Sequence, residues 1–128
     1  MADLSDISIL DHQEISDFIF INRDSWNSPQ ESSEDHLIEI NNEASISARF
    51  YFKNSDSTNI LLFHANAELP IDYDGLKQDF FSMNTNLFVV SYRGYGQGIG
   101  TPTIINSLND SEHIYNYFKN VLSEKNAQ

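Results

Sequence analysis

The sequence predicts an α/β fold, in which a small sheet is flanked by helices. Two apolar runs without alternation, residues 60–63 and 87–90, have the pattern of strands that are buried on both faces. Between them, residues 71–84 carry apolar side chains at helical spacing, namely Tyr73, Leu76, Phe80 and Met83. Two buried strands joined by a helix should run parallel, with a right-handed crossover.

An antiparallel hairpin is predicted before this unit. Residues 36–40 and 45–52 are strand-like runs, and the second places Ile46, Ala48, Phe50 and Phe52 at alternate positions. The polar stretch Asn41-Asn42-Glu43 between the two runs predicts the turn.

The first 34 residues are predicted to be a weakly structured lead-in segment, followed by one domain over residues 35–128. Ile15, Phe18 and Ile19 could form one face of a helix, whereas residues 18–21 could equally form a short strand. Periodicity does not decide between these two alternatives. Residues 25–35 are rich in Ser, Pro and acidic side chains, which indicates a loop.

The last element is predicted to be a long helix. Thr101-Pro102-Thr103 supplies a capping hydroxyl and a proline suited to a helix start. The residues after it form one apolar stripe with a period of about 3.6, made of Ile104, Ile105, Leu108, Ile114, Tyr115, Phe118, Val121 and Leu122.

Composition excludes several classes of function. The 128 residues include 19 acidic and 7 basic side chains, which give a net charge of −12 and would repel a nucleic acid. The chain has no Cys, so a disulfide framework or a thiolate metal site is impossible. No apolar run is long enough to span a bilayer, and no metal or cofactor signature is present. A cytoplasmic protein is expected.

Two turns could carry chemistry. His64-Ala65-Asn66-Ala67 directly follows the first buried run, where a sharp turn would point backbone amides into the crevice in which α/β proteins bind ligands. Such amides can stabilise an oxyanion, although a histidine at a strand end more often packs than catalyses. The second turn, residues 93–100, holds four alternating glycines. Their spacing fits neither GxGxxG nor a Walker A loop, so we expect positive φ angles and close backbone approaches instead.

Together these motifs resemble the α/β-hydrolases of the small serine-hydrolase type, over about residues 37–122. The matching pieces are residues 61–66, residues 89–96 and Gly100-Thr101-Pro102, with Arg93-Gly94-Tyr95-Gly96 as the most specific element and Asp110 at a family position. The resemblance implies that the backbone amide of Ala65 or Asn66 forms one arm of an oxyanion hole. It also implies that the hairpin lies at one side of the sheet, followed by the fourth strand and then the third, with helices on opposite faces of the sheet.

The departures from the family are as informative. Ala65 replaces a glycine, which could strain the turn, and Ser91 replaces an acid. No GxSxG nucleophile elbow is present, and neither His64 nor His113 has a triad around it. We therefore expect a truncated or split hydrolase-like protein, inactive alone, with no ester turnover and no labelling by a fluorophosphonate. This interpretation would have to be abandoned if the two buried runs were antiparallel, or if a hydroxyl were in contact with an imidazole beside Asn66.

The alternative is a non-catalytic binding or assembly module. In the hydrolase architecture the third strand is covered by a later strand, so here its apolar edge should be open to pairing with another chain. We expect a homo-oligomer, or a complementing C-terminal half, through this edge or the sheet faces. A carrier of a small-molecule ligand is the third possibility.

Overall fold

The computed structural model describes residues 4–127, and their side chains from residue 8 onward. Residues 1–3 of the predicted lead-in segment and Gln128 lie outside the described residues. Along the chain, the elements are the 3-10 helix η1 (Leu4–Asp11), α1 (Gln13–Ile19), β1 (Ser33–Asn41), β2 (Ala44–Tyr51), β3 (Thr58–Phe63), the 3-10 helix η2 (Pro70–Leu76), α2 (Lys77–Ser82), β4 (Thr85–Val90) and α3 (Ile104–Glu124).

The four strands form one mixed sheet in the order β1-β2-β4-β3. β1 and β2 are an antiparallel hairpin, β2 and β4 are antiparallel, and β3 and β4 are parallel. The predicted hairpin and the predicted parallel pair are thus confirmed. β1 nevertheless begins within residues 25–35, where we expected only a loop, because Ser33 pairs with Tyr51 at the far end of β2.

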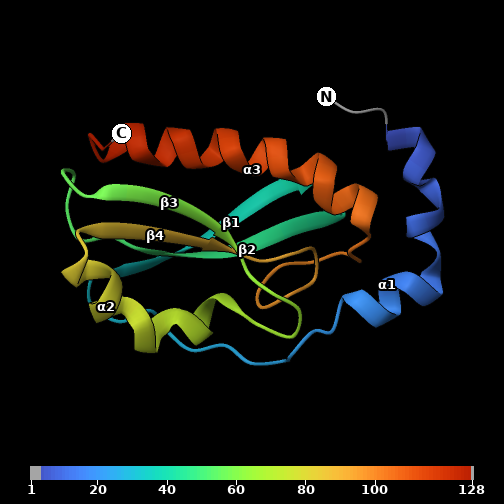
Figure 1. Ribbon diagram of the computed structural model, residues 1–128, viewed down its shortest axis with the longest axis horizontal. Helices are drawn as coiled ribbons and strands as arrows, with labels where there is room; N and C mark the ends of the chain where they lie inside the picture. Colours follow the sequence, from blue (N-terminus) through green and yellow to red (C-terminus); the bar gives the residue numbers. More distant parts are fainter. Residues whose placement is uncertain (1–3, 128) are drawn as a thin grey trace.

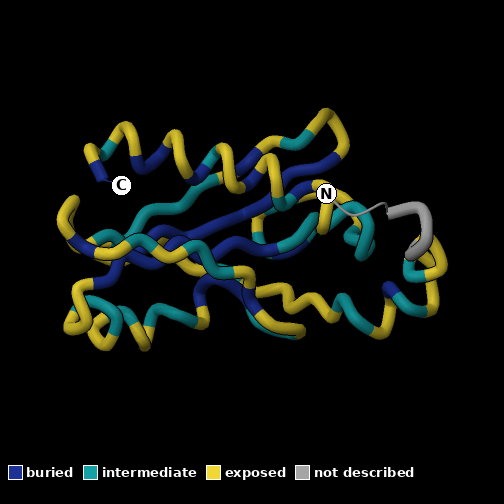
Figure 2. The backbone as a smooth tube through the Cα atoms, turned by 45° about the horizontal axis from the view of Figure 1, so that its top comes forward, coloured by how far each residue is buried: buried dark blue, intermediate teal, exposed yellow. Residues whose placement is uncertain are grey.

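Helices cover both faces of the sheet (Figure 1). α3 packs on one face, where Ile114 and Phe118 meet Phe50 and Phe88 in the main core. η2 and α2 lie against the other face, where Tyr73 and Phe80 pack against a smaller cluster, which contains Tyr51, Leu87 and Val89. Figure 2 shows β2 and β4 buried along their lengths between these layers.

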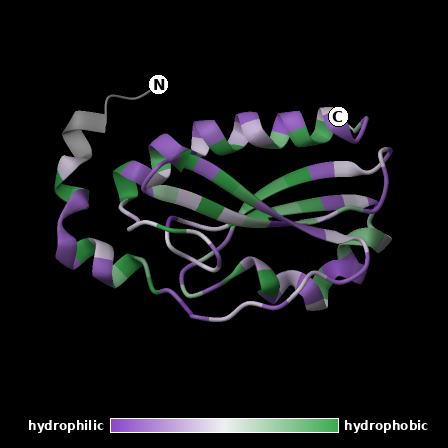
Figure 3. Ribbon diagram, turned by 180° about the vertical axis from the view of Figure 1, so that it is seen from behind, coloured by the Kyte–Doolittle hydropathy of each residue, from purple (hydrophilic) through white to green (hydrophobic). Residues whose placement is uncertain are grey.

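α3 begins as the sequence predicts. The Thr103 hydroxyl accepts a hydrogen bond from the backbone N–H of Asn106 at 3.0 Å and so caps the helix. Hydrophobic residues gather on the side of α3 toward the sheet (Figure 3). The predicted stripe is not buried in full, however, because Leu108 and Tyr115 remain exposed beside the β3 edge.

The helix predicted over residues 71–84 is divided in two. Its first part, η2, is a 3-10 helix that begins at Pro70, and only residues 77–82 are α-helical. Because the number of residues per turn changes between these parts, the predicted apolar positions do not share one face. Leu76 and Met83 are exposed.

Of the two alternatives left open for the lead-in segment, the structure contains the helix, because α1 covers Gln13–Ile19 and no strand forms over residues 18–21. Phe18 is nevertheless 80% exposed, so it does not share a buried apolar face with its neighbours on α1. The expectation that β3 is buried on both faces was wrong: β3 is an edge strand that pairs only with β4 in the described chain, and Ile60 and Phe63 are exposed. No helix among the described residues combines the length and apolar character that a membrane crossing requires.

Candidate functional site

The two turns singled out in the sequence lie side by side. β3 and β4 run parallel with Phe63 opposite Val90, so His64 and Ser91 leave the sheet together. Nε2 of His64 lies 2.7 Å from Oγ of Ser91. A serine hydroxyl therefore does contact an imidazole beside Asn66, which is the contact that bears against the interpretation without a nucleophile. Sequence reasoning missed this contact.

The hydrogen bonds of His64 define its tautomer. Nδ1 lies 2.9 Å from the carbonyl oxygen of Ala65, and since a carbonyl only accepts, Nδ1 carries the proton. Nε2 therefore accepts the hydroxyl proton of Ser91. Burial lowers the pKa of His64 because removal from water disfavours the charged ring. The imidazole is thus neutral, with its lone pair toward the serine.

A nucleophile also has to be reachable, and this pair is not. The His64 and Ser91 side chains are buried, and the rings of Tyr92 and Tyr95 lie 5.1 and 5.7 Å from the imidazole. The cavity beside Ser91 has a volume of about 10 Å³, which is room for one water at most. No substrate carbonyl fits there, so the pair acts as a cross-link between the ends of β3 and β4.

Of the two backbone amides proposed for the oxyanion arm, that of Ala65 is already occupied by the chain itself. The backbone N–H of Ala65 donates to Oε1 of Glu68 at 2.9 Å, so a carboxylate of this chain sits where an oxyanion would. Oδ1 of Asn66 accepts the backbone N–H of Ile21 at 3.0 Å. The backbone strain that we expected at Ala65 is found two residues later, at Ala67, which has a positive φ of 64°.

The glycine turn behaves as predicted. Gly94, Gly96 and Gly100 have positive φ angles. At Gly98 a Cβ would lie 2.4 Å from the carbonyl oxygen of Ser45, which leaves no space for a side chain. The positive φ angles and the close backbone approach account for the alternating glycines, so a bound nucleotide is not needed to explain them.

An ion pair joins the same turn to α3. The guanidinium of Arg93 donates to both carboxylate oxygens of Asp110, at 2.7 and 2.9 Å. The bidentate pair holds the turn against the helix.

The lead-in segment lies over these strand ends (Figure 1). The ring of Phe20 packs edge-on against Tyr92 at 5.5 Å, and Nδ2 of Asn22 donates to the carbonyl of Gly94 at 3.0 Å. An apolar groove of about 350 Å³ remains between α1, α3 and the strand ends. The lead-in is therefore a packed part of the crevice, which its sequence did not predict.

The outer edge of β3 is the most unusual surface of the molecule. Ile60 is 38% exposed and Phe63 is 41% exposed, and no residue of Thr58–Phe63 carries a charge. The opposite edge strand, β1, contains Glu34, Asp35, His36 and Glu39. Charged side chains protect sheet edges from pairing, so β1 is protected and β3 is not.

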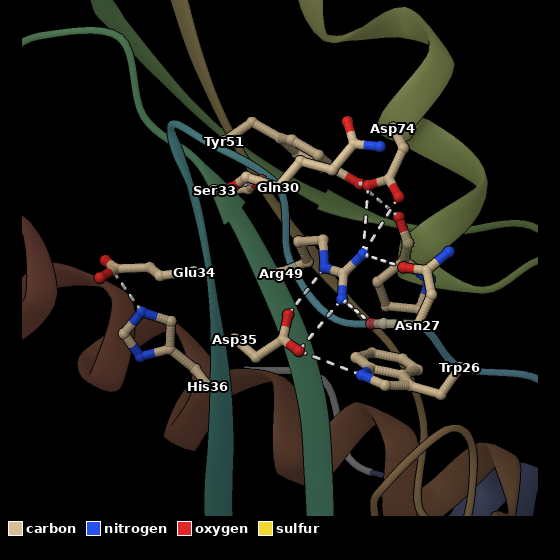
Figure 4. A network of polar contacts seen from close by, with 11 residues as sticks. Trp26, Asn27, Gln30, Ser33, Glu34, Asp35, His36, Arg49, Tyr51 and Asp74 are labelled. Carbon is tan, nitrogen blue, oxygen red and sulfur yellow. Dashed lines mark hydrogen bonds and ion pairs between the residues drawn. The ribbon is translucent and has the colours of Figure 1, made fainter.

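Sequence reasoning also missed a buried ion cluster on β2. The Arg49 side chain is completely shielded from solvent and contacts the carboxylates of Asp35 and Asp74 (Figure 4). The only feature of the sequence that pointed to this cluster was an arginine within the strand predicted over residues 45–52. The cluster is satisfied internally, which indicates a structural role.

The Glu34-Asp35-His36 stretch does not form a metal site. His36 approaches Glu34 at 3.2 Å, whereas Asp35 points to the other side of β1 toward Arg49 (Figure 4). Within residues 4–127, no group of three His, Asp or Glu side chains could hold a metal ion. His113 is exposed on α3.

The comparisons with known proteins do not identify a relative. No family model, no curated protein and no solved structure matches this chain.

The depressed pKa of His64 predicts a pH-dependent stability. The unfolded chain takes up this proton below about pH 6.5 while the folded chain resists it, so the free energy of unfolding should fall as the pH drops below 6.5. One such group contributes at most about 1.4 kcal/mol per pH unit. Urea unfolding between pH 7.5 and 5 would measure the slope. His64→Gln should reduce it and the exposed-site control His113→Gln should not; equal slopes would contradict the prediction.

Proposed function

We propose that this chain is a non-catalytic assembly module that receives a β-strand from another polypeptide at the edge of β3. The observation that carries the proposal is the uncharged and unpaired edge Thr58–Phe63, on which Ile60 and Phe63 are exposed, whereas the opposite edge strand, β1, is charged. An added strand would satisfy the backbone groups of β3 and cover the exposed Ile60 and Phe63.

The neighbouring face of α3 supports this assignment. Leu108 and Tyr115 are exposed beside β3, next to grooves of about 350 and 690 Å³. A partner that adds a strand could also bury side chains against this face. Such an interface would combine main-chain hydrogen bonds with apolar contacts.

In a purified sample, the available strand is the β3 edge of a second copy. We therefore expect self-association at micromolar concentration, which light scattering coupled to size-exclusion chromatography would measure. Ile60→Lys should yield a monomer, because an ammonium on the edge disfavours strand pairing. Leu37→Lys is the matched control, since Leu37 is 48% exposed on β1, and it should self-associate like the wild type. A wild-type chain that is strictly monomeric would count against self-pairing.

The second candidate is one half of a serine hydrolase whose catalytic elements come from a complementing chain. The parallel β3–β4 pair with its glycine turn favours it, because the order β1-β2-β4-β3 is the one that the resemblance implies. The two proposals share the same edge. Labelling with a fluorophosphonate in the presence of the bound partner distinguishes them. If the chain is an assembly module, neither protein is labelled. If the two chains form a hydrolase, the reagent labels the serine of the partner.

A further inference from the structure

The groove between β3 and the C-terminal half of α3 is large enough to hold part of a partner chain. Its volume is about 690 Å³, within the range of ligand sites. Tyr115, Phe118 and Leu122 supply apolar walls from α3, and Asn59 lines it from β3. Leu61, two residues along β3, packs into the same core as α3, so alternation places Asn59 on this face as well.

One buried donor in this groove has no acceptor. Nδ2 of Asn59 is shielded from solvent and makes no hydrogen bond in the described chain. Its orientation is set by its neighbours, because Oδ1 of Asn59 accepts from Nδ2 of Asn86 at 2.9 Å, and Oδ1 of Asn86 accepts from the backbone of Lys53 at 2.7 Å. A buried donor without a partner is destabilising, so an acceptor supplied from outside would be favourable.

A cation in the same groove also lacks a counter-ion. The Lys119 ammonium lies 4.8 Å from the centre of the Tyr115 ring. Across residues 8–127 no carboxylate comes within ion-pair distance of it, Asp56 in the lining included. The groove therefore offers an amide donor and an ammonium that the described residues leave unmatched, in a protein with 19 acidic side chains.

From these two donors we infer that the strand received by β3 carries a carboxylate, which enters the groove toward Asn59 and Lys119. The inference rests on the proposed strand addition. β3 itself contains no Asp or Glu, so a second copy paired strand to strand brings no carboxylate on that strand. The partner is therefore a different polypeptide with one acidic residue among uncharged neighbours.

The net charge of −12 limits the partner to few acidic residues. Interactions between exposed charges are largely screened beyond about 8 Å at physiological salt, whereas a carboxylate in direct contact with Lys119 lies well within that distance. One carboxylate at Lys119 is therefore attracted locally, while a strongly acidic segment would be repelled by the rest of the surface.

Three synthetic peptides test the inference, each acetylated and amidated: Val-Thr-Val-Asp-Val-Thr and the versions with Asn or Lys in place of Asp. Each is titrated into ¹⁵N-labelled protein, and shifts of the β3 amide resonances report binding. We expect the Asp peptide to bind at least about tenfold more tightly than the Lys peptide. Lys119→Glu should reverse this order, and Asn59→Leu should reduce the preference for Asp over Asn.

The control is Lys77→Glu, which changes the net charge equally but lies on α2 on the opposite face of the sheet. It should keep the preference for the Asp peptide. If no peptide shifts the β3 resonances, strand addition itself is wrong. If all three bind alike, or if Lys77→Glu reverses the order as Lys119→Glu does, strand addition stands and the carboxylate inference is overturned.

Discussion

Arg49→Ala should lower the free energy of unfolding by on the order of 3–5 kcal/mol. The guanidinium donates to Asp35 at 2.7 Å and to Asp74 at 3.1 Å, and its side chain is completely buried (Figure 4). It also donates to Oδ1 of Asn27 at 2.7 Å and lies 5.1 Å from the centre of the Trp26 ring.

The size of this effect comes from what alanine leaves behind. Asp35 and Asp74 are themselves only 21% and 16% exposed, so without the guanidinium two poorly hydrated carboxylates face each other. Tyr51 is coupled to the same group, because its hydroxyl donates to Asp74 at 2.6 Å. Burial next to this carboxylate raises the pKa of Tyr51, which keeps the hydroxyl protonated as a donor.

Urea unfolding would measure the loss, with two comparisons. Arg23→Ala removes an arginine–aspartate pair at the surface and should change stability far less, because water screens that pair. Arg49→Lys should recover only part of the loss, since one ammonium cannot contact both carboxylates in the fork geometry of a guanidinium. An Arg49→Ala protein as stable as Arg23→Ala would show that the cluster contributes little.

Phe88→Ala is expected to cost about 3–5 kcal/mol as well, for a different reason. Phe88 is fully buried in the centre of the sheet, and its ring centroid lies 5.2 Å from that of Phe50 and 5.1 Å from that of Phe118 on α3. Alanine would lose these contacts and leave a cavity between β4 and α3 that the close-packed core cannot fill.

Phe18→Ala is the matched control for Phe88→Ala. Phe18 is 80% exposed on α1, so its truncation should change stability little. The same urea experiment compares both variants. Equal destabilisation of the two would contradict the core position of Phe88.

Local signals in the sequence were sufficient for most of the architecture. A strand-like run with Leu37 and Ile38 predicted β1, alternating apolar positions predicted β2, and the two uniform runs predicted β3 and β4 and their parallel direction. The Thr103 cap and the positive φ angles of the glycine turn were also predictable. The strands, the cap and the glycine turn depend on preferences within a few neighbouring residues, and the parallel direction follows from the order strand, helix, strand.

The candidate site was predictable only as positions along the chain. His64, Ala65 and Asn66 were singled out as an oxyanion-side turn, but their partners were not. Ser91 lies 27 residues from His64, and Ile21 lies 45 residues from Asn66, so no local pattern shows either contact.

Sequence pattern alone therefore determined where the strands, the capped helix and the glycine turn lie, because each is encoded by the spacing and the φ preferences of adjacent residues. Only the tertiary structure decided that Arg49 is buried between two carboxylates, that a serine and a histidine meet out of reach of any substrate, and that β3 is open at its edge. Side-chain burial and the contacts of Arg49, His64 and Ser91 depend on residues far apart in the chain, and no single stretch of sequence contains both partners.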